Sequence, residues 1–348
     1  MQIKDIGNYM LSKYLNPDTK ATLKRLIDES DNIMVVCHRG PDGDAVGSSL
    51  GLACAMSKIG KNVNVVAPNK IPENYESMSN IRSFLSFEEN QEEVVKKAKN
   101  VDLFFFLDFN DIKRIGLMAN LIKGVNAKMV QIDHHENPTL KVDVCISDPK
   151  CSSTAMMTYK VLVELGYEHL IDKQAAEYFY TGMMTDTGNF SYNSNDPEIY
   201  EIINRFLKLG IDKDRIYRDI FNTCPENIIR LNAHVLCNCM TVDYDLHCAF
   251  LTLNKADQET FGFKHGNDEG LVNKPLAIPG VYYSVFLRED PNHIHISARS
   301  KKGYNVSKLC ETLGGGGHGN AAGAEYKEGN IDDAERRIRE YLSNHITN

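Results

Sequence analysis

The first half of the chain alternates short, mostly apolar runs with longer stretches of helical spacing. The apolar runs cover residues 33–37, 63–67, 102–107 and 127–132. The helical stretches cover residues 45–59, 153–165 and 173–185. Apolar runs that do not alternate regularly with polar residues are typical of strands that are covered on both faces, as in a parallel sheet flanked by helices. The pattern predicts an α/β domain with a parallel sheet over residues 1–195.

The pattern changes at Asp196-Pro197, where polar-rich helical stretches begin and continue to about residue 240. We interpret residues 196–240 as a helical connector. Beyond it, two strand-like runs flank a Glu-Asp-Pro-Asn sequence, which predicts a hairpin. A glycine cluster and a charged helix close the chain. Residues 241–348 are therefore predicted to form a smaller α/β domain with a mixed sheet.

Acidic and histidine side chains follow the strand-like runs of the first domain. The candidates are His38, Asp42 and Asp44 in HRGPDGDAVG, Asp108, Asn110 and Arg114 in LDFNDIKRIG, Asp133-His134-His135, and Asp186 in GMMTDTGNF. In open α/β sheets, ligand sites form at the carboxyl ends of the strands. We therefore expect these segments to converge in space.

A pair of metal ions gives this convergence a physical reason. Carboxylates left side by side repel one another and raise each other's pKa values, and divalent cations remove that repulsion. Mixed carboxylate and imidazole ligands without thiolate suit manganese or magnesium better than structural zinc. Each motif alone has a simpler interpretation as a turn, a helix cap or a core histidine pair. Their appearance in order at strand ends favours the metal site.

Composition narrows the function further. The chain has 348 residues and a net charge of −8, which suggests two domains and argues against coating long nucleic acid electrostatically. Nine cysteines without a CxxC motif, no signal-like N-terminus and no long apolar run predict a reduced, cytoplasmic protein. A structural zinc at Cys237 and Cys239 would need two more ligands, and no partner pair stands at the right spacing.

The motifs resemble those of a known family. HRGPDGDA, LDF with Arg114 downstream, IDHH and MTDTG are similar to the four motifs of the DHH phosphoesterase superfamily. HISARSKKGYNVSKLCETLGGGGHGNAAGA resembles the DHHA1 substrate domain. Together they resemble the nanoRNase/pAp phosphatase group over most of the chain.

The resemblance implies a role for each candidate residue. One metal would be held by His38, Asp42 and Asp108, and the other by Asp44, Asp108, His134 and Asp186. Asp133 would orient His134 or the backbone around it, His135 would face the scissile phosphate, and Arg114 and Asn110 would position or buttress the active-site loop. In the second domain the substrate would be bound by Arg299, Gly315, Gly316, Gly317 and His318. The implied cofactor is two Mn²⁺ ions, with Mg²⁺ or Co²⁺ as possible substitutes.

The implied reaction is hydrolysis of short oligoribonucleotides to mononucleotides and of 3′-phosphoadenosine 5′-phosphate (pAp) to AMP. The expected partners are short single-stranded RNA and pAp, without long duplex nucleic acid or a membrane, and relatives are commonly homodimers. A linear or cyclic dinucleotide phosphodiesterase is the alternative, because the same pocket would take pApA. A non-catalytic nucleotide sensor is disfavoured, because all six ligand positions keep metal-binding side chains.

Overall fold

The computed structural model describes residues 11–264, 266–268 and 270–345, which divide into two compact units. Each unit contains a six-stranded sheet with apolar cores against it. No helix among the described residues combines the length and the apolar character needed to cross a membrane. We describe each unit by itself.

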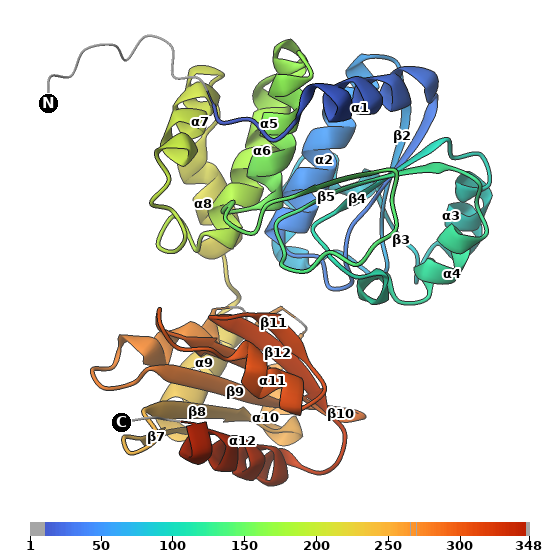
Figure 1. The fold of residues 1–348 in the computed structure, drawn as a ribbon. Coiled ribbons are helices and arrows are strands. Elements are labelled where there is room, and N and C mark those ends of the chain that lie inside the picture. Colours follow the sequence, from blue (N-terminus) through green and yellow to red (C-terminus); the bar gives the residue numbers. More distant parts are fainter. Residues whose placement is uncertain (1–10, 265, 269, 346–348) are drawn as a thin grey trace, which may run out of the picture. The chain divides into compact units, whose positions relative to one another are not determined.

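The sheet of the first unit is entirely parallel (Figure 1). Its strands are β1 (Asn32–Val36), β2 (Asn62–Ala67), β3 (Phe84–Ser86), β4 (Leu103–Leu107), β5 (Lys128–Asp133) and β6 (Val144–Ser147). The order across the sheet is β3-β2-β1-β4-β5-β6. The four longest strands coincide with the four apolar runs, so the predicted parallel α/β architecture is confirmed.

Helices cover both faces of this sheet (Figure 1). The helices of this unit are α1 (Pro17–Glu29), α2 (Gly43–Lys58), α3 (Gln91–Ala98), α4 (Met118–Lys123), α5 (Thr154–Glu164), α6 (Lys173–Asp186), α7 (Pro197–Lys208) and α8 (Lys213–Phe221), of which α7 and α8 pack on α6. Along β1, Ile33 and Val35 pack into the core with α2, α5 and α6, whereas Met34 and Val36 pack into the core with α3 and α4. Burial on both faces explains why residues 33–36 of this strand are all apolar.

Helices α2 and α6 meet backbone to backbone along a seam of glycines. A side chain at Gly47 would overlap the carbonyl oxygen of Tyr178, and one at Gly51 would overlap the Phe179 ring. From the other helix, a Cβ at Gly182 would lie 2.5 Å from the Cβ of Ala155 and 2.8 Å from Oδ1 of Asp44. The seam therefore brings the start of α2 and the end of α6 close together.

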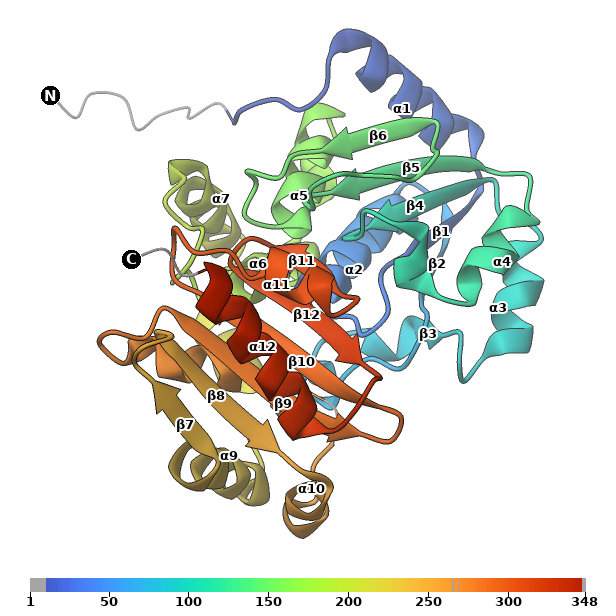
Figure 2. The same ribbon diagram turned by 60° about the horizontal axis from the view of Figure 1, so that its bottom comes forward.

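The second unit is a mixed sheet with helices on both faces (Figure 2). Its strands are β7 (Met240–Asp243), β8 (Cys248–Leu253), β9 (Tyr283–Asp290), β10 (His293–Ser300), β11 (Gly316–His318) and β12 (Ala321–Tyr326), in the order β11-β12-β10-β9-β8-β7. Its helices are α9 (Glu226–Asn238), α10 (Lys255–Phe261), α11 (Ser307–Thr312) and α12 (Ile331–His345). Only β8 and β9 pair in parallel. The predicted mixed sheet is confirmed.

Two details of the second sheet differ from the sequence interpretation. The hairpin between β9 and β10 is tighter than predicted, because Asp290 still pairs with His293 and only Pro291 and Asn292 lie between the strands. The glycine cluster is not wholly a loop, because its end forms the short edge strand β11 against β12. Residues with no large side chain can still complete a ladder, since the hydrogen bonds come from the backbone.

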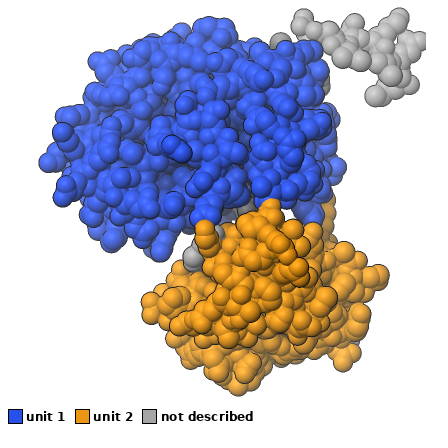
Figure 3. Space-filling view, turned by 180° about the vertical axis from the view of Figure 1, so that it is seen from behind, with its two compact units in different colours: residues 1–223 blue, residues 224–348 orange. Residues whose placement is uncertain are grey.

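The boundary between the units falls within the segment interpreted as a connector, at Thr223 and Cys224 (Figure 3). Helices α7 and α8 contact α6, and the buried Ile202, Phe206 and Ile216 join the core of the first unit. Helix α9 instead packs on β7 and β8 of the second unit. Of the amphipathic helices in residues 196–240, α7 and α8 thus belong to the first unit and α9 belongs to the second.

Candidate metal centre

The predicted site lies where the strand order of the first sheet reverses. Strands β1 and β4 are neighbours at the centre of the sheet. From there the order continues to β2 on the β1 side and to β5 on the β4 side. Such a reversal leaves a crevice at the carboxyl ends of the strands, because the connecting helices leave in opposite directions. His38 follows β1, Asp108 directly follows β4, and His134 follows β5.

Two helix ends complete the site. Asp42 caps α2, its side chain accepting hydrogen bonds from the backbone N–H groups of Asp44 at 3.0 Å and Ala45 at 3.1 Å. Asp44 therefore lies in the first turn of α2, and Asp186 is the last residue of α6. Because the glycine seam joins these helices, both carboxylates reach the same crevice.

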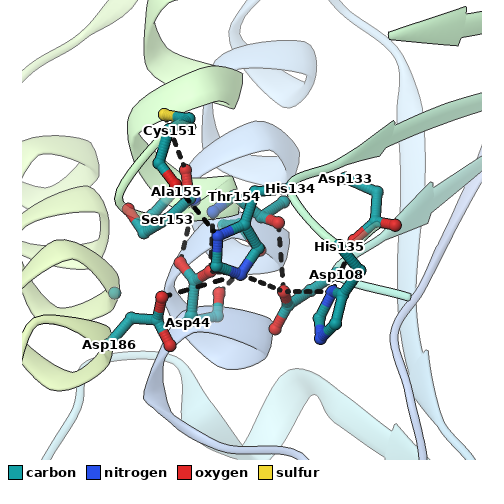
Figure 4. Close-up of polar contacts among 12 residues, drawn as sticks. Asp44, Asp108, Asp133, His134, His135, Cys151, Ser153, Thr154, Ala155 and Asp186 are labelled. Atoms are coloured by element: carbon teal, nitrogen blue, oxygen red, sulfur yellow. Dashed lines mark hydrogen bonds and ion pairs between the residues drawn. The ribbon is translucent and has the colours of Figure 1, made fainter. Parts of the chain in front are cut away.

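The six expected ligand residues converge into two groups that share Asp108. Nε2 of His38 lies 3.4 Å from Oδ2 of Asp108 and 3.8 Å from Oδ1 of Asp42. In the second group, the distances from Nε2 of His134 are 3.5 Å to Oδ1 of Asp108, 3.9 Å to Oδ2 of Asp44 and 3.6 Å to Oδ2 of Asp186 (Figure 4). Asp108 thus presents one carboxylate oxygen to each group.

The backbone selects the histidine nitrogens that face these carboxylates. Nδ1 of His38 lies 2.9 Å from the carbonyl oxygen of Arg39, and Nδ1 of His134 lies 3.2 Å from that of Cys151. A carbonyl only accepts, so each Nδ1 carries a hydrogen and donates it. In the neutral ring, Nε2 then keeps the lone pair that a metal requires. The observed donor set therefore fits divalent cations.

Charge gives a second reason for a cation. Burial would lower the pKa of His38, but its contacts with Asp108 and Asp42 outweigh burial and raise the pKa to about 10. Burial and the neighbouring Asp108 and Asp186 carboxylates raise the pKa of Asp44 well above its usual range. Among the described residues, Asp42, Asp44 and Asp108 form their ion pairs with histidines, so protons on these rings offset part of the local negative charge when no cation is bound.

The start of helix α5 also holds Asp44 (Figure 4). The backbone N–H groups of Thr154 and Ala155, at the start of α5, donate to the two oxygens of Asp44 at 2.6 Å and 2.8 Å. The hydroxyl of Thr154 also donates to Oδ1 of Asp108 at 3.0 Å. A helix N-terminus favours negative charge, so α5 orients two carboxylates of the site at once.

Replacing Thr154 with valine tests this orientation. The valine keeps the volume but loses the hydrogen bond to Asp108, so metal affinity and hydrolysis should fall about 10- to 100-fold, as for other partners of metal ligands. Metal titration and steady-state kinetics measure both. Thr158→Val is the matched control, because the buried Thr158 hydroxyl, one turn further along α5, has no hydrogen-bond partner among the described residues. Equal losses of metal affinity and hydrolysis in the two variants would contradict the orienting role of Thr154.

Asp133 contacts a different histidine from the one expected. Its Oδ1 accepts from Nδ1 of His135 at 2.7 Å, whereas His134 donates to the Cys151 carbonyl instead. Asp133 is fully buried, and its Oδ2 has no hydrogen-bond partner among the described residues. Nδ1 of His135 also lies 3.8 Å from Oδ1 of Asp108. The Asp133–His135 pair therefore lies against the shared carboxylate.

Asn110 and Arg114 contact loops that carry site residues. The Asn110 amide donates to the carbonyl of Glu136 at 2.6 Å, directly after His135. The side chain of Arg114 is exposed, and its carbonyl oxygen accepts from the N–H of Arg39 at 2.8 Å. Both contacts brace neighbouring loops. Arg114 makes its contact with Arg39 through its backbone carbonyl.

The predicted substrate residues lie together at one end of the second sheet. Arg299 on β10 pairs with Ala321 on β12, which pairs in turn with the backbone of His318 on β11. The side chain of His318 lies outside what the structure describes. Gly315 and Gly317 have a steric reason for being glycine, because a Cβ at either would overlap the backbone of β12. Around Gly316 there is open space.

The sequence interpretation missed the contributions of the segment before α5. Neither the Cys151 carbonyl nor the Thr154 N–H belongs to a recognisable ligand type. The signal that was available is Ser153-Thr154 at the start of a helical stretch, since Ser153 caps α5 by accepting from the N–H of Met156. A capped helix start indicates where backbone N–H groups are exposed.

Comparisons with known proteins show the family of the chain. Residues 32–183 match the model described as "DHH family, N-terminal domain", and residues 259–344 match the DHHA1 domain. The chain is 30% identical to "Bifunctional oligoribonuclease and PAP phosphatase NrnA" of Thermus thermophilus, over 90% of both chains. It is 27% identical to the protein of the same name in Bacillus subtilis, over 91% of this chain and 96% of the relative.

Other relatives match in part or in fold. Cyclic-di-AMP phosphodiesterase PdeA of Listeria monocytogenes is 25% identical over 91% of this chain but 48% of its own. A solved exopolyphosphatase-related protein of Bacteroides fragilis has a TM-score of 0.92 at 39% identity, covering 96% of this chain and 98% of that one. RecJ of Thermus thermophilus, solved with Mn²⁺, shares the fold with a TM-score of 0.53 at 12% identity, over 94% of this chain and 54% of RecJ.

Proposed function

Because the chain belongs to the DHH family and carries a DHHA1 domain, we propose that it is a metal-dependent phosphoesterase that hydrolyses short oligoribonucleotides to mononucleotides and pAp to AMP. The observation that carries this proposal is similarity over 90% and 91% of the chain to two bifunctional oligoribonuclease and PAP phosphatases. The convergence of histidine and aspartate side chains at the sheet crevice supports it independently.

We further propose that two divalent cations bind in the crevice. His38, Asp42 and Asp108 would hold one, and Asp44, Asp108, His134 and Asp186 the other. Oxygen and imidazole donors without thiolate suit Mn²⁺, with Mg²⁺ or Co²⁺ as substitutes. Bound there, such ions supply Lewis acidity that stabilises the charge developing on a phosphoryl group.

Among the residues of the chain itself, we assign proton transfer to His135. Donation from its Nδ1 to Asp133 fixes the tautomer, so Nε2 is the atom that can take up and release a proton. The buried carboxylate of Asp133 holds the ring in this orientation, because it lies 2.7 Å from Nδ1 and is enclosed by protein. His135 would then protonate the leaving oxygen of the substrate.

Residues of the second unit would bind the substrate. Arg299 offers a planar, permanently charged donor suited to a phosphate, and its Nη1 already donates to the carbonyl of Ala298 at 3.0 Å, which limits its freedom. The backbone of Gly316, with open space around it, is the part of the glycine segment that a ligand could approach.

Arg299→Ala should raise the KM for pAp about 10- to 100-fold, the effect of losing a charge-assisted hydrogen bond to phosphate, with little change in metal affinity. Steady-state kinetics and manganese titration separate the two quantities. Lys327→Ala is the control, since Lys327 is exposed and contacts Glu325 on the same sheet. A collapse of manganese affinity in Arg299→Ala would contradict the assignment of Arg299 to substrate.

Cyclic dinucleotide hydrolysis is the second candidate, favoured by similarity to cyclic-di-AMP phosphodiesterases. The chain spans only about half of those proteins, whereas it spans nine tenths or more of the oligoribonuclease relatives. Product analysis on pAp, labelled di- to pentanucleotides, pApA and cyclic di-AMP at equal concentration distinguishes them. Faster turnover of cyclic di-AMP than of pAp and short RNA would overturn the proposed preference.

We also propose that the protein works in the cytoplasm. All nine cysteines are free in the structure. Several of them are buried as small apolar residues, which suits a compartment that keeps thiols reduced.

A further inference from the structure

A second cluster of metal-ligating side chains lies in the second unit. It consists of His234 on α9, Cys239 at the end of α9, and Asp257 in the first turn of α10. Nε2 of His234 lies 3.4 Å from Sγ of Cys239 and 3.3 Å from Oδ1 of Asp257. The three ligand atoms all lie within 4.8 Å of one another. The cluster falls between the two segments that match the DHH and DHHA1 models.

Secondary structure fixes the position of each of these residues. The N–H of Cys239 donates to the carbonyl of Val235 at 3.1 Å, and the carbonyl of Cys239 accepts from the N–H of Thr252 at 3.2 Å. Asn254 caps α10 by accepting from the N–H of Asp257 at 2.8 Å. The arrangement therefore belongs to the folded backbone rather than to mobile side chains.

The two distances from His234 match the edges of a tetrahedral zinc site. With zinc bonds of about 2.0–2.1 Å to nitrogen, about 2.0 Å to oxygen and about 2.3 Å to sulfur, tetrahedral angles put nitrogen about 3.3 Å from oxygen and about 3.6 Å from sulfur. The observed separations are 3.3 Å and 3.4 Å. An optimal N–H···O hydrogen bond would be shorter, about 2.9–3.0 Å.

Charge and ligand softness point to the same ion. A thiolate at Cys239 and the carboxylate of Asp257 together carry two negative charges, which one divalent cation neutralises. A thiolate ligand selects zinc over manganese and magnesium, unlike the all-oxygen and imidazole donors of the first unit.

From these observations we propose that His234, Cys239 and Asp257 bind one Zn²⁺ ion, with water as the fourth ligand. The ion ties the C-terminal end of α9 to the first turn of α10. This site is separate from the metal centre of the first unit and does not depend on the proposed reaction.

The neighbour of His234 accommodates the required tautomer. Nδ1 of His234 lies 3.1 Å from the side-chain amide of Asn238, one turn further along α9. When zinc is bound to Nε2 of His234, Nδ1 carries the hydrogen and needs an acceptor. Turning the Asn238 amide over exchanges its oxygen and its nitrogen, which are nearly equal in size, and places the oxygen against Nδ1. Asn238 thus orients the ring from outside the ligand set.

Cobalt substitution tests the proposal directly. Co²⁺ bound by a thiolate gives a sulfur-to-metal charge-transfer band in the near ultraviolet, and the donor set of the first unit contains no thiolate to produce one. The full-length protein titrated with Co²⁺ should show the band, and Zn²⁺ should remove it. Cys239→Ser should abolish the band, whereas Cys237→Ser, at an exposed position two residues away, should retain it.

Thermal unfolding provides an independent measurement. Zn²⁺ should raise the Tm of the full-length protein more than that of Cys239→Ser or Asp257→Asn, because only the intact cluster binds the extra ion. Manganese-dependent hydrolysis should be unchanged in Cys239→Ser. Absence of the cobalt band, its survival in Cys239→Ser, or equal Tm shifts in all three proteins would each overturn the proposal.

Discussion

Replacing Asp108 with asparagine should reduce hydrolysis of pAp on the order of 10³-fold or more, while the protein still folds. Its Oδ2 faces His38 and its Oδ1 faces His134, so one residue contributes to both proposed cation sites. Asparagine keeps one of these oxygens, replaces the other with an N–H₂ group that cannot bind a cation, and removes the negative charge. Both sites therefore weaken at once.

The backbone makes asparagine the right substitution. Asp108 has a φ of +67°, in the left-handed region where asparagine and aspartate are the best tolerated residues after glycine. An alanine would add backbone strain to the loss of a ligand. Circular dichroism should show an unchanged fold, and activity should not return when manganese is raised.

A control for this variant lies at the other end of the same strand. Asp102 immediately precedes β4, and its carboxylate accepts from the N–H groups of Asp31 and Asn32 at 3.0 Å and 2.8 Å. Asp102→Asn keeps an acceptor oxygen there and should retain nearly full activity. Full hydrolytic activity in Asp108→Asn would contradict the proposed metal-dependent mechanism.

Removing metal should abolish hydrolysis, and adding Mn²⁺ back should restore it. The expected pH dependence follows from His38. Its pKa is raised to about 10, so in the metal-free protein the ring is protonated throughout the neutral range, and a cation must displace that proton. Metal affinity should therefore keep rising as the pH rises from 6 towards about 10 rather than levelling off near 6.5, the usual pKa of histidine.

Calorimetric titration of the metal-free protein in buffers of different ionisation enthalpy measures the protons released. His38→Gln should release fewer protons and bind manganese more weakly. His169→Gln is the control, because His169 is exposed and its Nδ1 contacts the Gly166 carbonyl. Activity that survives thorough chelation, or metal binding without proton release at pH 7, would contradict the proposed site.

The strands could be predicted from the sequence where several consecutive residues are buried. Strands β1, β2, β4 and β5 have apolar residues packed on both faces, so each leaves a mostly apolar run in the sequence. Strands β3 and β6 escaped prediction because they are only three and four residues long and lie at the sheet edges, where one neighbour is missing. A short edge strand has too few buried positions to produce a pattern.

The site was predictable where side chains carry the chemistry, and not where the backbone does. The six predicted ligand positions converge because each follows a parallel strand or lies at a helix end at the same edge. The carbonyl of Cys151 and the N–H groups at the start of α5 act through atoms that every residue has. Their roles depend on three-dimensional position alone.

Two smaller predictions also show the difference between what side-chain types indicate and what only the three-dimensional structure shows. Gly315 and Gly317 were expected to bind the substrate, but close packing against β12 already requires glycine at both. The pair Cys237 and Cys239 lacked zinc partners at a recognisable spacing. The fold supplies His234 from the preceding turn of α9 and Asp257 from a separate helix, a combination that no linear motif describes.

The glycine seam between α2 and α6 also limits which cation the first unit can accept. Because the two backbones touch, no layer of side chains can yield to move Asp44 away from Asp186. Ca²⁺ needs oxygen ligands at about 2.3–2.6 Å, whereas Mg²⁺ takes about 2.0–2.1 Å. Selection by ionic radius would then originate in two helices that lie too close together to admit a single methyl group.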